Sequence, residues 1–312
     1  MDIIRFPDDP PPARWTQPVL ALGNFDGVHR GHQKVLDSVR RVAGERGATS
    51  VVMTFDPHPS RVVRPDKAPP LLMTTAQKLE AIAAAGLQGA AIVRFTPELS
   101  RWAPETFVET VLVDWLKVAS VWVGANFLFG HDRTGNFSLL RMLGGRYNFK
   151  AEKIDPVRYK DFVVSSTRIR RLVSEGRVDE AAALLGHQYY LEGTVMRGEE
   201  RGRTIGFPTA NLSTENELLP SHGVYATTTT VDGVVRPSVT NVGVRPTVDA
   251  SGRTSVETHI FSLDRNLYGA SIRVGFVQRL RDERTFESLD VLRAQIAADC
   301  DKARVLFDRL SL

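Results

Sequence analysis

The chain has 312 residues, of which 42% are hydrophobic and 24% charged, and its formal net charge is +4. That length corresponds to about two domains on a prior of roughly 150 residues each. Ordinary apolar content with charges of both signs excludes an intrinsically disordered chain. The one cysteine, Cys300, excludes a disulfide framework and a thiolate-rich metal site, and it favours a cytoplasmic location.

No segment predicts secretion or membrane insertion. The N-terminal sequence MDIIRFPDDPPPARW contains several prolines and no apolar core, which argues against a signal peptide. The longest apolar stretch, Val111–Phe129, is interrupted by polar and charged side chains and is too broken to span a bilayer. A net charge of +4 over 312 residues is a weak field, and sites for several phosphate groups would produce the same bias.

The first half of the chain alternates strand-like and helix-like segments. Strands are expected at 18–23, 50–55, 89–95 and 120–124, and helices at 32–46, 75–85, 104–116 and from Asn136 to the Gly144-Gly145 pair. Such alternation predicts a parallel sheet covered by helices on both faces. Ligands of such sheets bind at the carboxyl ends of the strands.

The pattern changes near Gly186, after a helical segment at 166–185. Strand-like runs follow at 223–231, 234–242, 254–261 and 270–280, and Asp232-Gly233 predicts a type I′ hairpin turn between the first two. A closing helix at 289–310 is expected to turn five side chains toward a core: Leu292, Ile296, Ala303, Leu306 and Leu310. The second half therefore predicts a small antiparallel β-barrel or sandwich with a C-terminal helix. The predicted domains are 1–186 and 187–312.

The segment GNFDGVHRGHQK (23–34) places His29 and His32 just before and at the start of a predicted helix. Two imidazoles there can point at one anion together with free backbone N–H groups and the positive end of the helix dipole. Neither a Walker A loop nor GxGxxG is present. Two other interpretations stay open: a metal site that uses Asp26, the two histidines and His58, and surface histidines in a Gly-rich turn.

The segment VVSSTRIRRLVSEG (163–176) has two interpretations as well. A hydroxyl of the SST triplet can cap a helix that ends near Gly176, and this alone explains the sequence. Alternatively Ser166 and Arg170, four residues apart on one helical face, hold a polyphosphate together with the helix N-terminus.

The segment GTVMRGEERGRTIGFPTANL (193–212) combines glycines at 198, 202 and 206 with three arginines. This composition suits a loop that closes over phosphates, although a solvated hairpin loop of mixed charge is the alternative. If Pro208–Asn211 is extended, Thr209 and Asn211 project to one face and present neutral oxygens, which together with nucleotide phosphates can hold Mg²⁺. As a bare tetrapeptide the segment is equally compatible with a turn.

The first-half motifs resemble the HxGH nucleotidyltransferases, and more narrowly the FMN adenylyltransferase module of bacterial bifunctional riboflavin kinase/FAD synthetases. The resemblance rests on LGNFDGVHRGHQ, TFDPHP (54–59), VGANFLFGHDRTGN (123–136) and VSSTRIR (164–170). It implies a Rossmann-like fold in which His29 and His32 contact ATP phosphates and stabilise the transition state. It further implies a nucleotide site formed by Gly23, Phe25, Asp26, Gly31, Asn126, Ser166, Thr167 and Arg170. Members often carry a basic residue before the serine pair, where this chain has Phe162-Val163-Val164.

PTAN (208–211) is similar to the signature of the riboflavin kinase (flavokinase) family, and HGVYA, TNVGVRPT, VETHIF, LYG and RDERTF follow in the chain. With the first half, the resemblance covers nearly all of the sequence. It implies that Thr209 and Asn211 coordinate the Mg²⁺ of Mg-ATP, that Gly202 and Gly206 belong to the phosphate loop, and that Glu257 is the catalytic base. An outward charge on a strand, between inward Val256 and Thr258, is the alternative for Glu257.

The function that the resemblance implies is a bifunctional enzyme of FAD synthesis. Riboflavin is phosphorylated to FMN, and FMN is adenylylated to FAD and pyrophosphate, with ATP as co-substrate and Mg²⁺ as cofactor. Expected ligands are riboflavin, FMN and ATP, with no nucleic acid or membrane partner and with self-association left open. Two rivals are a different phosphorylated acceptor for the first domain and a basic nucleic-acid binder; the second lacks arginines clustered with aromatic residues.

Overall fold

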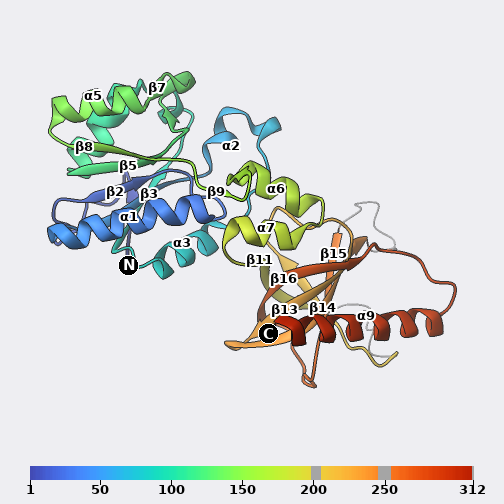
Figure 1. The fold of residues 1–312 in the computed structure, drawn as a ribbon. Coiled ribbons are helices and arrows are strands. Elements are labelled where there is room, and N and C mark those ends of the chain that lie inside the picture. The colour runs from blue at the N-terminus through green and yellow to red at the C-terminus, as the bar shows by residue number, and fades with distance from the viewer. Residues whose placement is uncertain (198–204, 245–253, 311–312) are drawn as a thin grey trace. The chain divides into compact units, whose positions relative to one another are not determined.

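The computed structural model describes residues 1–197, 205–244 and 254–310, and the chain divides into two compact units, Met1–Ser166 and Thr167–Leu312 (Figure 1). Each unit is described by itself. Two helices that precede residue 186, α6 (Ser166–Ser174) and α7 (Val178–Leu185), are grouped almost entirely with the second unit. The functional boundary near residue 186 stays a prediction.

The first unit contains a six-stranded sheet in which every neighbouring pair is parallel, as the strand–helix alternation predicts. Its order is β1 (Asp2–Phe6), β4 (Gly89–Arg94), β3 (Ser50–Asp56), β2 (Val19–Leu22), β5 (Ser120–Gly124) and β8 (Lys150–Ile154). The sequence pattern does not indicate the two edge strands, β1 and β8, because they carry many exposed side chains and lack the apolar runs of the buried strands.

Helices cover both faces of this sheet (Figure 1). One face packs against α1 (Arg30–Arg46) and α3 (Thr75–Ala84), and the other against α4 (Pro104–Phe107), the π-helix η3 (Val108–Trp115) and α5 (Phe137–Tyr147). The remaining short elements are α2 (Pro59–Val63), β6 (Leu128–Phe129), β7 (Gly135–Asn136), β9 (Arg158–Tyr159), β10 (Phe162–Val163) and three 3₁₀ turns, η1 (Pro65–Lys67), η2 (Leu99–Arg101) and η4 (His131–Arg133).

The expected stop of the fourth helix at Gly144-Gly145 is wrong. Asn136 caps α5 as predicted, since its side chain accepts a hydrogen bond from the Leu139 N–H, but the helix continues through both glycines. It ends at Asn148, which adopts a left-handed conformation with φ 61°. Gly144 is needed for packing instead, because a Cβ there would lie 2.6 Å from the carbonyl oxygen of Phe149.

The second unit contains a closed antiparallel barrel, which confirms the barrel prediction. The strand order is β11 (Tyr189–Met196), β12 (Ala210–Thr214), β15 (Thr254–Ile260), β14 (Val234–Val244), β13 (Gly223–Val231) and β16 (Ser271–Arg281), which pairs back with β11. Asp232 and Gly233 join β13 to β14 with φ angles of 49° and 78°, as a type I′ turn requires.

Hydroxyl side chains fill part of the barrel interior. Thr240 shares hydrogen bonds of 2.8 and 2.9 Å with Thr227 and Thr258, which lie on the neighbouring strands, and all three are fully buried. Because successive side chains of a strand point to opposite faces, the inward Thr258 sets Glu257 and His259 on the outside of β15.

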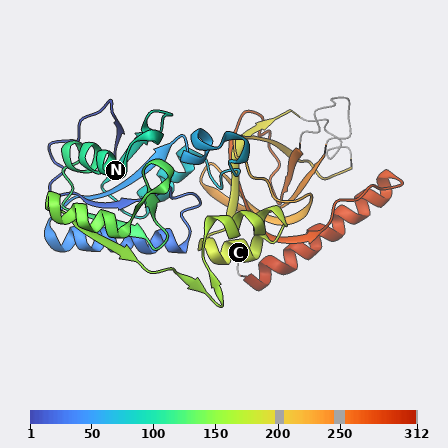
Figure 2. The ribbon, with the colours of Figure 1, turned by 90° about the horizontal axis from the view of Figure 1, so that it is seen from above.

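The closing helix α9 (Leu289–Leu310) has the predicted bounds and lies against β13, β14 and β16 (Figure 2). Its expected buried stripe is only partly right. Ala303 is buried, whereas Leu310 is 49% exposed, and Cys300 and Phe307 are buried on either side of Ala303. These three positions follow helical spacing and pack against Phe261. Burial raises the pKa of the Cys300 thiol to about 11, so the group stays protonated.

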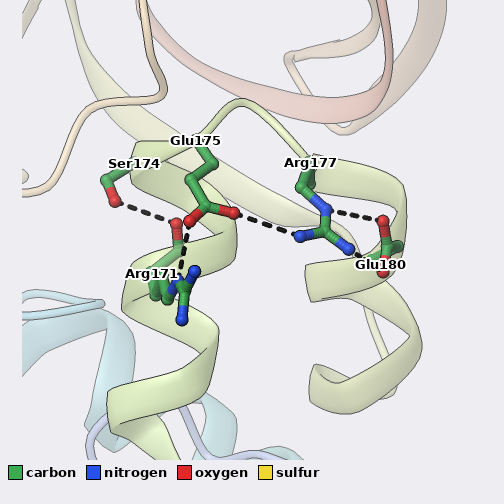
Figure 3. Close-up of polar contacts among 5 residues, drawn as sticks. All are labelled: Arg171, Ser174, Glu175, Arg177 and Glu180. Carbon is green, nitrogen blue, oxygen red and sulfur yellow. Dashed lines mark hydrogen bonds and ion pairs between the residues drawn. The ribbon is translucent and has the colours of Figure 1, made fainter.

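Charged side chains join α6 to α7 across the turn at Gly176 (Figure 3). Arg177 donates two hydrogen bonds of 2.7 Å to the carboxylate of Glu180 and one of 3.1 Å to Glu175, which also accepts from Arg171 at 2.7 Å. These arginines lower the pKa values of both glutamates. All the groups are largely exposed, so the free energy of each pair is small and their main effect is to orient the turn.

We expect Gly176→Ala to lower the free energy of unfolding of the second unit by about 1–3 kcal/mol. Gly176 has φ +76°, and a Cβ there would clash with Ser221 Oγ and lie 2.8 Å from the Tyr225 hydroxyl oxygen. Gly269→Ala is the matched control, since Gly269 has φ +79° and a Cβ there would meet no neighbouring atom within 4 Å. Thermal unfolding followed by circular dichroism measures both variants, and an equal loss in the two would show that the close contacts cost nothing.

Candidate active sites

The first site lies where β2 ends and α1 begins. Residues 23–29 connect the two elements through left-handed conformations at Phe25, Gly27 and Val28. His29 is the N-cap of α1, and its imidazole Nδ1 accepts a hydrogen bond of 3.2 Å from the backbone N–H of His32. The helix therefore begins at Arg30, two residues earlier than predicted, because a histidine takes the capping position that Ser, Thr, Asp or Asn usually occupy.

The two histidine rings are stacked, with centroids 3.6 Å apart and planes 12° apart. Gly31 leaves room for the ring of His29, since a Cβ at position 31 would lie 3.1 Å from Cε1 of that ring, a tight contact. Because His29 Nδ1 accepts a hydrogen bond it carries no proton, so the ring is neutral and its N–H is on Nε2. The sequence interpretation of surface histidines is wrong for His29, which is only 6% exposed.

His32 is also held neutral. Burial lowers its pKa well below the usual histidine value of 6.5, a protonated His29 would lower it further, and the charge of Lys78 acts in the same direction. Its Nδ1 is buried, and no described residue forms a hydrogen bond with that atom. The pair is therefore suited to donate hydrogen bonds from uncharged rings.

Hydrogen bonds from three other segments hold the loop that leads to His29. The Asp26 carboxylate accepts from the Leu72 N–H at 3.0 and 3.2 Å, and the Ser166 hydroxyl donates to the Asp26 carbonyl oxygen at 2.9 Å. Thr54 Oγ1 donates to the Asn24 carbonyl oxygen at 3.0 Å. The Ser166 side chain therefore holds the Asp26 backbone, which is a contact within the first unit.

The remaining predicted residues of this site are placed as follows. Gly23 lies under the Phe25 ring, where a Cβ would lie 3.3 Å from the nearest ring carbon. Asn126 is exposed in the loop after β5, the strand that pairs with β2, so it shares the edge at which β2 ends. Thr167 and Arg170 follow Ser166 on α6 and belong to the second compact unit.

The metal interpretation of the histidine segment gains no support. Among residues 1–197, 205–244 and 254–310, no group of three His, Cys, Asp or Glu side chains is arranged to hold a metal ion. His58 is the N-cap of α2, where its ring accepts a hydrogen bond of 3.2 Å from the Ser60 N–H.

The second site lies on the outer face of the barrel. Glu257 on β15 pairs directly with Asn211 on β12 and with Asn241 on β14. Side chains at directly paired positions share a face, so an amide, a carboxylate and a second amide form a row across three strands. Asn211 is 8% exposed, and Thr209 directly precedes β12.

The segment that leads into β12 is anchored at Pro208. The His259 ring donates a hydrogen bond of 2.9 Å to the Pro208 carbonyl oxygen and also makes an edge contact with Phe207. Asn211 lies within β12, so the extended interpretation of PTAN holds there. Gly206 has φ +86°, a conformation that favours glycine, whereas Gly202 lies outside the described residues.

Sequence reasoning misses two polar groups beside this row. Asn241 lies in the TNVGVRPT motif, and Glu283 lies in RDERTF, but the motifs by themselves indicate no role for either. A Cβ at Gly243 would overlap Glu283 Oε1 and lie 3.0 Å from Asn241 Nδ2. Glycine at 243 therefore makes room for the Glu283 carboxylate beside the Asn241 amide. Residues 241 and 243 are two apart on β14 and share a face, and this spacing is the sequence signal that could have indicated the contact.

The first unit combines a parallel sheet with paired histidines, and the second combines a closed barrel with a row of one carboxylate and two amides. This combination is typical of a two-unit enzyme that transfers phosphate-containing groups. A family model of FAD synthetase matches residues 12–168, and a family model of riboflavin kinase matches residues 185–307. The chain therefore belongs to the bifunctional riboflavin kinase/FMN adenylyltransferase family. It carries both activities: it phosphorylates riboflavin to FMN and adenylylates FMN to FAD.

Curated relatives that are bifunctional riboflavin kinase/FMN adenylyltransferases support this assignment. The Escherichia coli K12 protein is 38% identical, with 93% of this chain and 92% of the relative covered. The Bacillus subtilis protein is 36% identical over 94% and 93% of the two chains. A solved structure described as a macrolide-efflux protein from Streptococcus pneumoniae has a TM-score of 0.87 and 26% identity over 97% of this chain and 99% of that chain. That description applies to the S. pneumoniae protein; in the described part of the present chain no helix is long and apolar enough to cross a membrane.

The lowered pKa of His32 predicts how stability depends on pH. The unfolded chain binds a proton near pH 6.5, whereas the folded protein binds it only at lower pH. The stabilising contribution is therefore present above pH 6.5 and is lost as the pH falls below it. The free energy of unfolding, measured with urea at about pH 8 and about pH 5, should fall less on acidification for His32→Gln than for wild type. An NMR titration with a His32 midpoint near 6.5 in the folded protein would contradict the prediction.

Proposed function

We propose that His29 and His32 form the adenylylation centre of the first unit. The observation that supports this most strongly is the stacked histidine pair at the N-terminus of α1, where the helix dipole favours an anion. His29 Nε2 and His32 donate to the phosphates of ATP. Gly23, Phe25, Asp26 and Gly31 shape the loop, and Asn126, Ser166, Thr167 and Arg170 complete the nucleotide site.

The adenylylation step needs hydrogen-bond donors rather than a general base. A phosphate oxygen of FMN attacks the α-phosphorus of ATP, a new P–O bond forms, and the bond to the leaving pyrophosphate breaks. The second pKa of a phosphomonoester is about 6, so the nucleophile is already an anion at pH 7. Neutral imidazole N–H groups stabilise the charge that develops on the transferred and leaving phosphates.

The kinase step needs a group that accepts a proton, that is, a general base. We propose that Glu257 takes the proton of the riboflavin hydroxyl as the hydroxyl oxygen attacks the γ-phosphorus of ATP and ADP leaves. Support comes from the position of Glu257 on the barrel exterior, between Asn211 and Asn241. We propose that Gly206, together with Gly202 outside the described residues, contacts the phosphates of ATP.

Magnesium is the proposed cofactor of the kinase centre. The Thr209 hydroxyl and the Asn211 amide offer neutral oxygens, which with the phosphates of ATP form a donor set of the kind that Mg²⁺ prefers. When bound, the ion neutralises phosphate charge. Thr209 and Asn211 hold it, and the Pro208–His259 hydrogen bond fixes the segment that carries them.

We further propose that the protein acts in the cytoplasm on riboflavin, FMN and ATP, without a nucleic-acid or membrane partner. The single, buried Cys300 and the weak net charge support this. A measurement of molar mass in solution decides whether the chain self-associates.

The two activities are tested together by incubation with riboflavin, Mg-ATP and inorganic pyrophosphatase, followed by separation of the flavins. FMN and then FAD should accumulate, and chelation of Mg²⁺ should stop both steps. Turnover that is undiminished in excess chelator would overturn the magnesium proposal.

We expect His29→Ala to abolish most FAD formation and to spare FMN formation. One donor to a developing oxyanion is worth roughly 10²–10³-fold, and the substitution also removes the cap that orients His32. Steady-state rates with supplied FMN measure the loss, and FMN formation from riboflavin by the same protein is the internal control. A folded His29→Ala protein that makes FAD at the wild-type rate would sink this assignment.

We expect Glu257→Gln to slow FMN formation by about 10²-fold or more, because glutamine keeps the size of the side chain but cannot accept a proton. Adenylylation of supplied FMN should stay close to wild type, since its nucleophile needs no base. The measurement is the rate of each step with its own flavin substrate.

Thr209→Ala separates the role of Glu257 from that of the metal site. Its FMN formation should also fall, but extra Mg²⁺ should partly restore it, whereas Glu257→Gln should not respond. Normal phosphorylation by Glu257→Gln shows that the base is misassigned. If both activities fall together, the two units are not independent.

A further inference from the structure

A buried lysine lies behind the histidine loop of the first unit, and the assigned chemistry does not use it. Lys78 is near the start of α3, after a capping box formed by Thr74 and Gln77. The lysine is only 4% exposed. Burying an ammonium group is costly unless carboxylates and hydrogen bonds compensate it, so this position calls for an explanation.

The contacts of Lys78 lead to the backbone of the histidine loop. Its Nζ donates to Thr54 Oγ1 at 3.3 Å, and Thr54 Oγ1 donates in turn to the Asn24 carbonyl oxygen at 3.0 Å. The ammonium group thereby orients the threonine hydroxyl, whose hydrogen then points at the loop. Asn24 is five residues before His29, and the positive φ angles between them make the loop sensitive to where it is anchored.

Lys78 also interacts electrostatically with the segment that leads to His29, through the carboxylate of Asp26. Burial lowers the pKa of Lys78, whereas the carboxylates of Asp26 and Asp56 act in the opposite direction. Asp26 is 2% exposed, and its carboxylate accepts the Leu72 N–H. A buried carboxylate is stabilised by a cation nearby, and Lys78 supplies one from α3.

We propose that Lys78 is a positioning residue of the adenylylation centre, whose buried ammonium group holds the Asn24–Asp26 segment so that His29 and His32 face the ATP phosphates. It acts through Thr54 and Asp26, without contact with the substrate. The proposal rests on the assignment of the two histidines to this centre.

Lys78 also affects the protonation of the histidine pair. The titratable groups that act on His32 are His29, from its own turn, and Lys78, from α3; each lowers the pKa of His32 when it carries a positive charge. Removing the lysine charge therefore raises the pKa of His32. This shift reports the loss of the charge, whereas kcat for FAD formation at a pH where His32 is neutral reports the positioning of the loop.

The test is Lys78→Met, which keeps most of the length of the side chain and removes the charge. Loops displaced by about 1 Å can cost up to roughly 10²-fold in rate, and we expect kcat for FAD formation to fall about tenfold or more. FMN formation should stay within about twofold of wild type, because its chemistry needs neither histidine. The acid limb of the pH profile for FAD formation should move to higher pH, together with the His32 midpoint in an NMR titration.

Two companion variants sharpen the result. Lys78→Arg restores the charge and should return the acid limb to its wild-type position. Lys150→Met is the matched control, because Lys150 is exposed at the start of β8, and it should leave both activities unchanged. If Lys78→Met does not fold, Lys78→Met/Asp26→Asn removes the buried ion together with its partner, and the same shift of the acid limb is expected in it.

A wild-type kcat and an unmoved acid limb in a folded Lys78→Met or double variant would overturn the proposal. The His29→Ala variant distinguishes an error in the role of Lys78 from an error in the assignment of the histidines to the adenylylation centre. If His29→Ala loses FAD formation while Lys78→Met does not, only the role of Lys78 is wrong. If neither variant affects FAD formation, the histidines are not the adenylylation centre.

Discussion

The hydrogen bond from the His32 backbone N–H to the His29 imidazole is the constraint on which the proposed adenylylation centre depends. A helix start has backbone N–H groups without intrahelical partners, and a capping side chain satisfies one of them. When a histidine is the cap, one ring nitrogen is consumed and the proton must lie on the other. The cap thus fixes the ring orientation, the tautomer and the charge of His29 at once. A serine cap would stabilise the helix equally well but would leave no second nitrogen to donate.

The second centre depends on a different constraint, the alternation of side chains along closed strands. Thr240 and Thr258 occupy the interior with buried hydroxyls that bond to one another. Their neighbours Asn241 and Glu257 must then point outward, on the same face as Asn211. A slip of one residue would exchange the interior hydroxyls for the outer amides and carboxylate. The hydroxyl network inside the barrel therefore helps to fix the register of the row outside it.

Much of this arrangement can be predicted from local sequence, and the exceptions share a cause. The buried strands of the first unit, the Asp232-Gly233 turn and the bounds of α9 follow from apolar runs, turn chemistry and helical periodicity. Local signals place the start of α1 too late because its cap is a histidine, and the end of α5 too early because Gly144 serves packing against Phe149.

Contacts between distant segments are the part of the sites that single-sequence reasoning could not supply. The motifs indicate Asp26 and Ser166, but nothing in their spacing shows that the hydroxyl of one donates to the carbonyl of the other. Glu283 lies far from Asn241 in the chain, and only the fold shows that Gly243 brings them together. Lys78 is a charged residue at a buried position of α3, where helical periodicity alone predicts an apolar side chain.

In the proposed assignment of residues, the two centres differ because their nucleophiles differ in one proton. An FMN phosphate arrives ionised, so a carboxylate beside it would repel the anion, and the structure has neutral N–H donors at its first site. A riboflavin hydroxyl arrives protonated, so donors alone would leave its proton in place, and the second site has a carboxylate between two amides. A single pocket that served both steps would have to place a base where the first nucleophile needs a donor. Electrostatics therefore favours two separate units for two reactions that share ATP and a flavin.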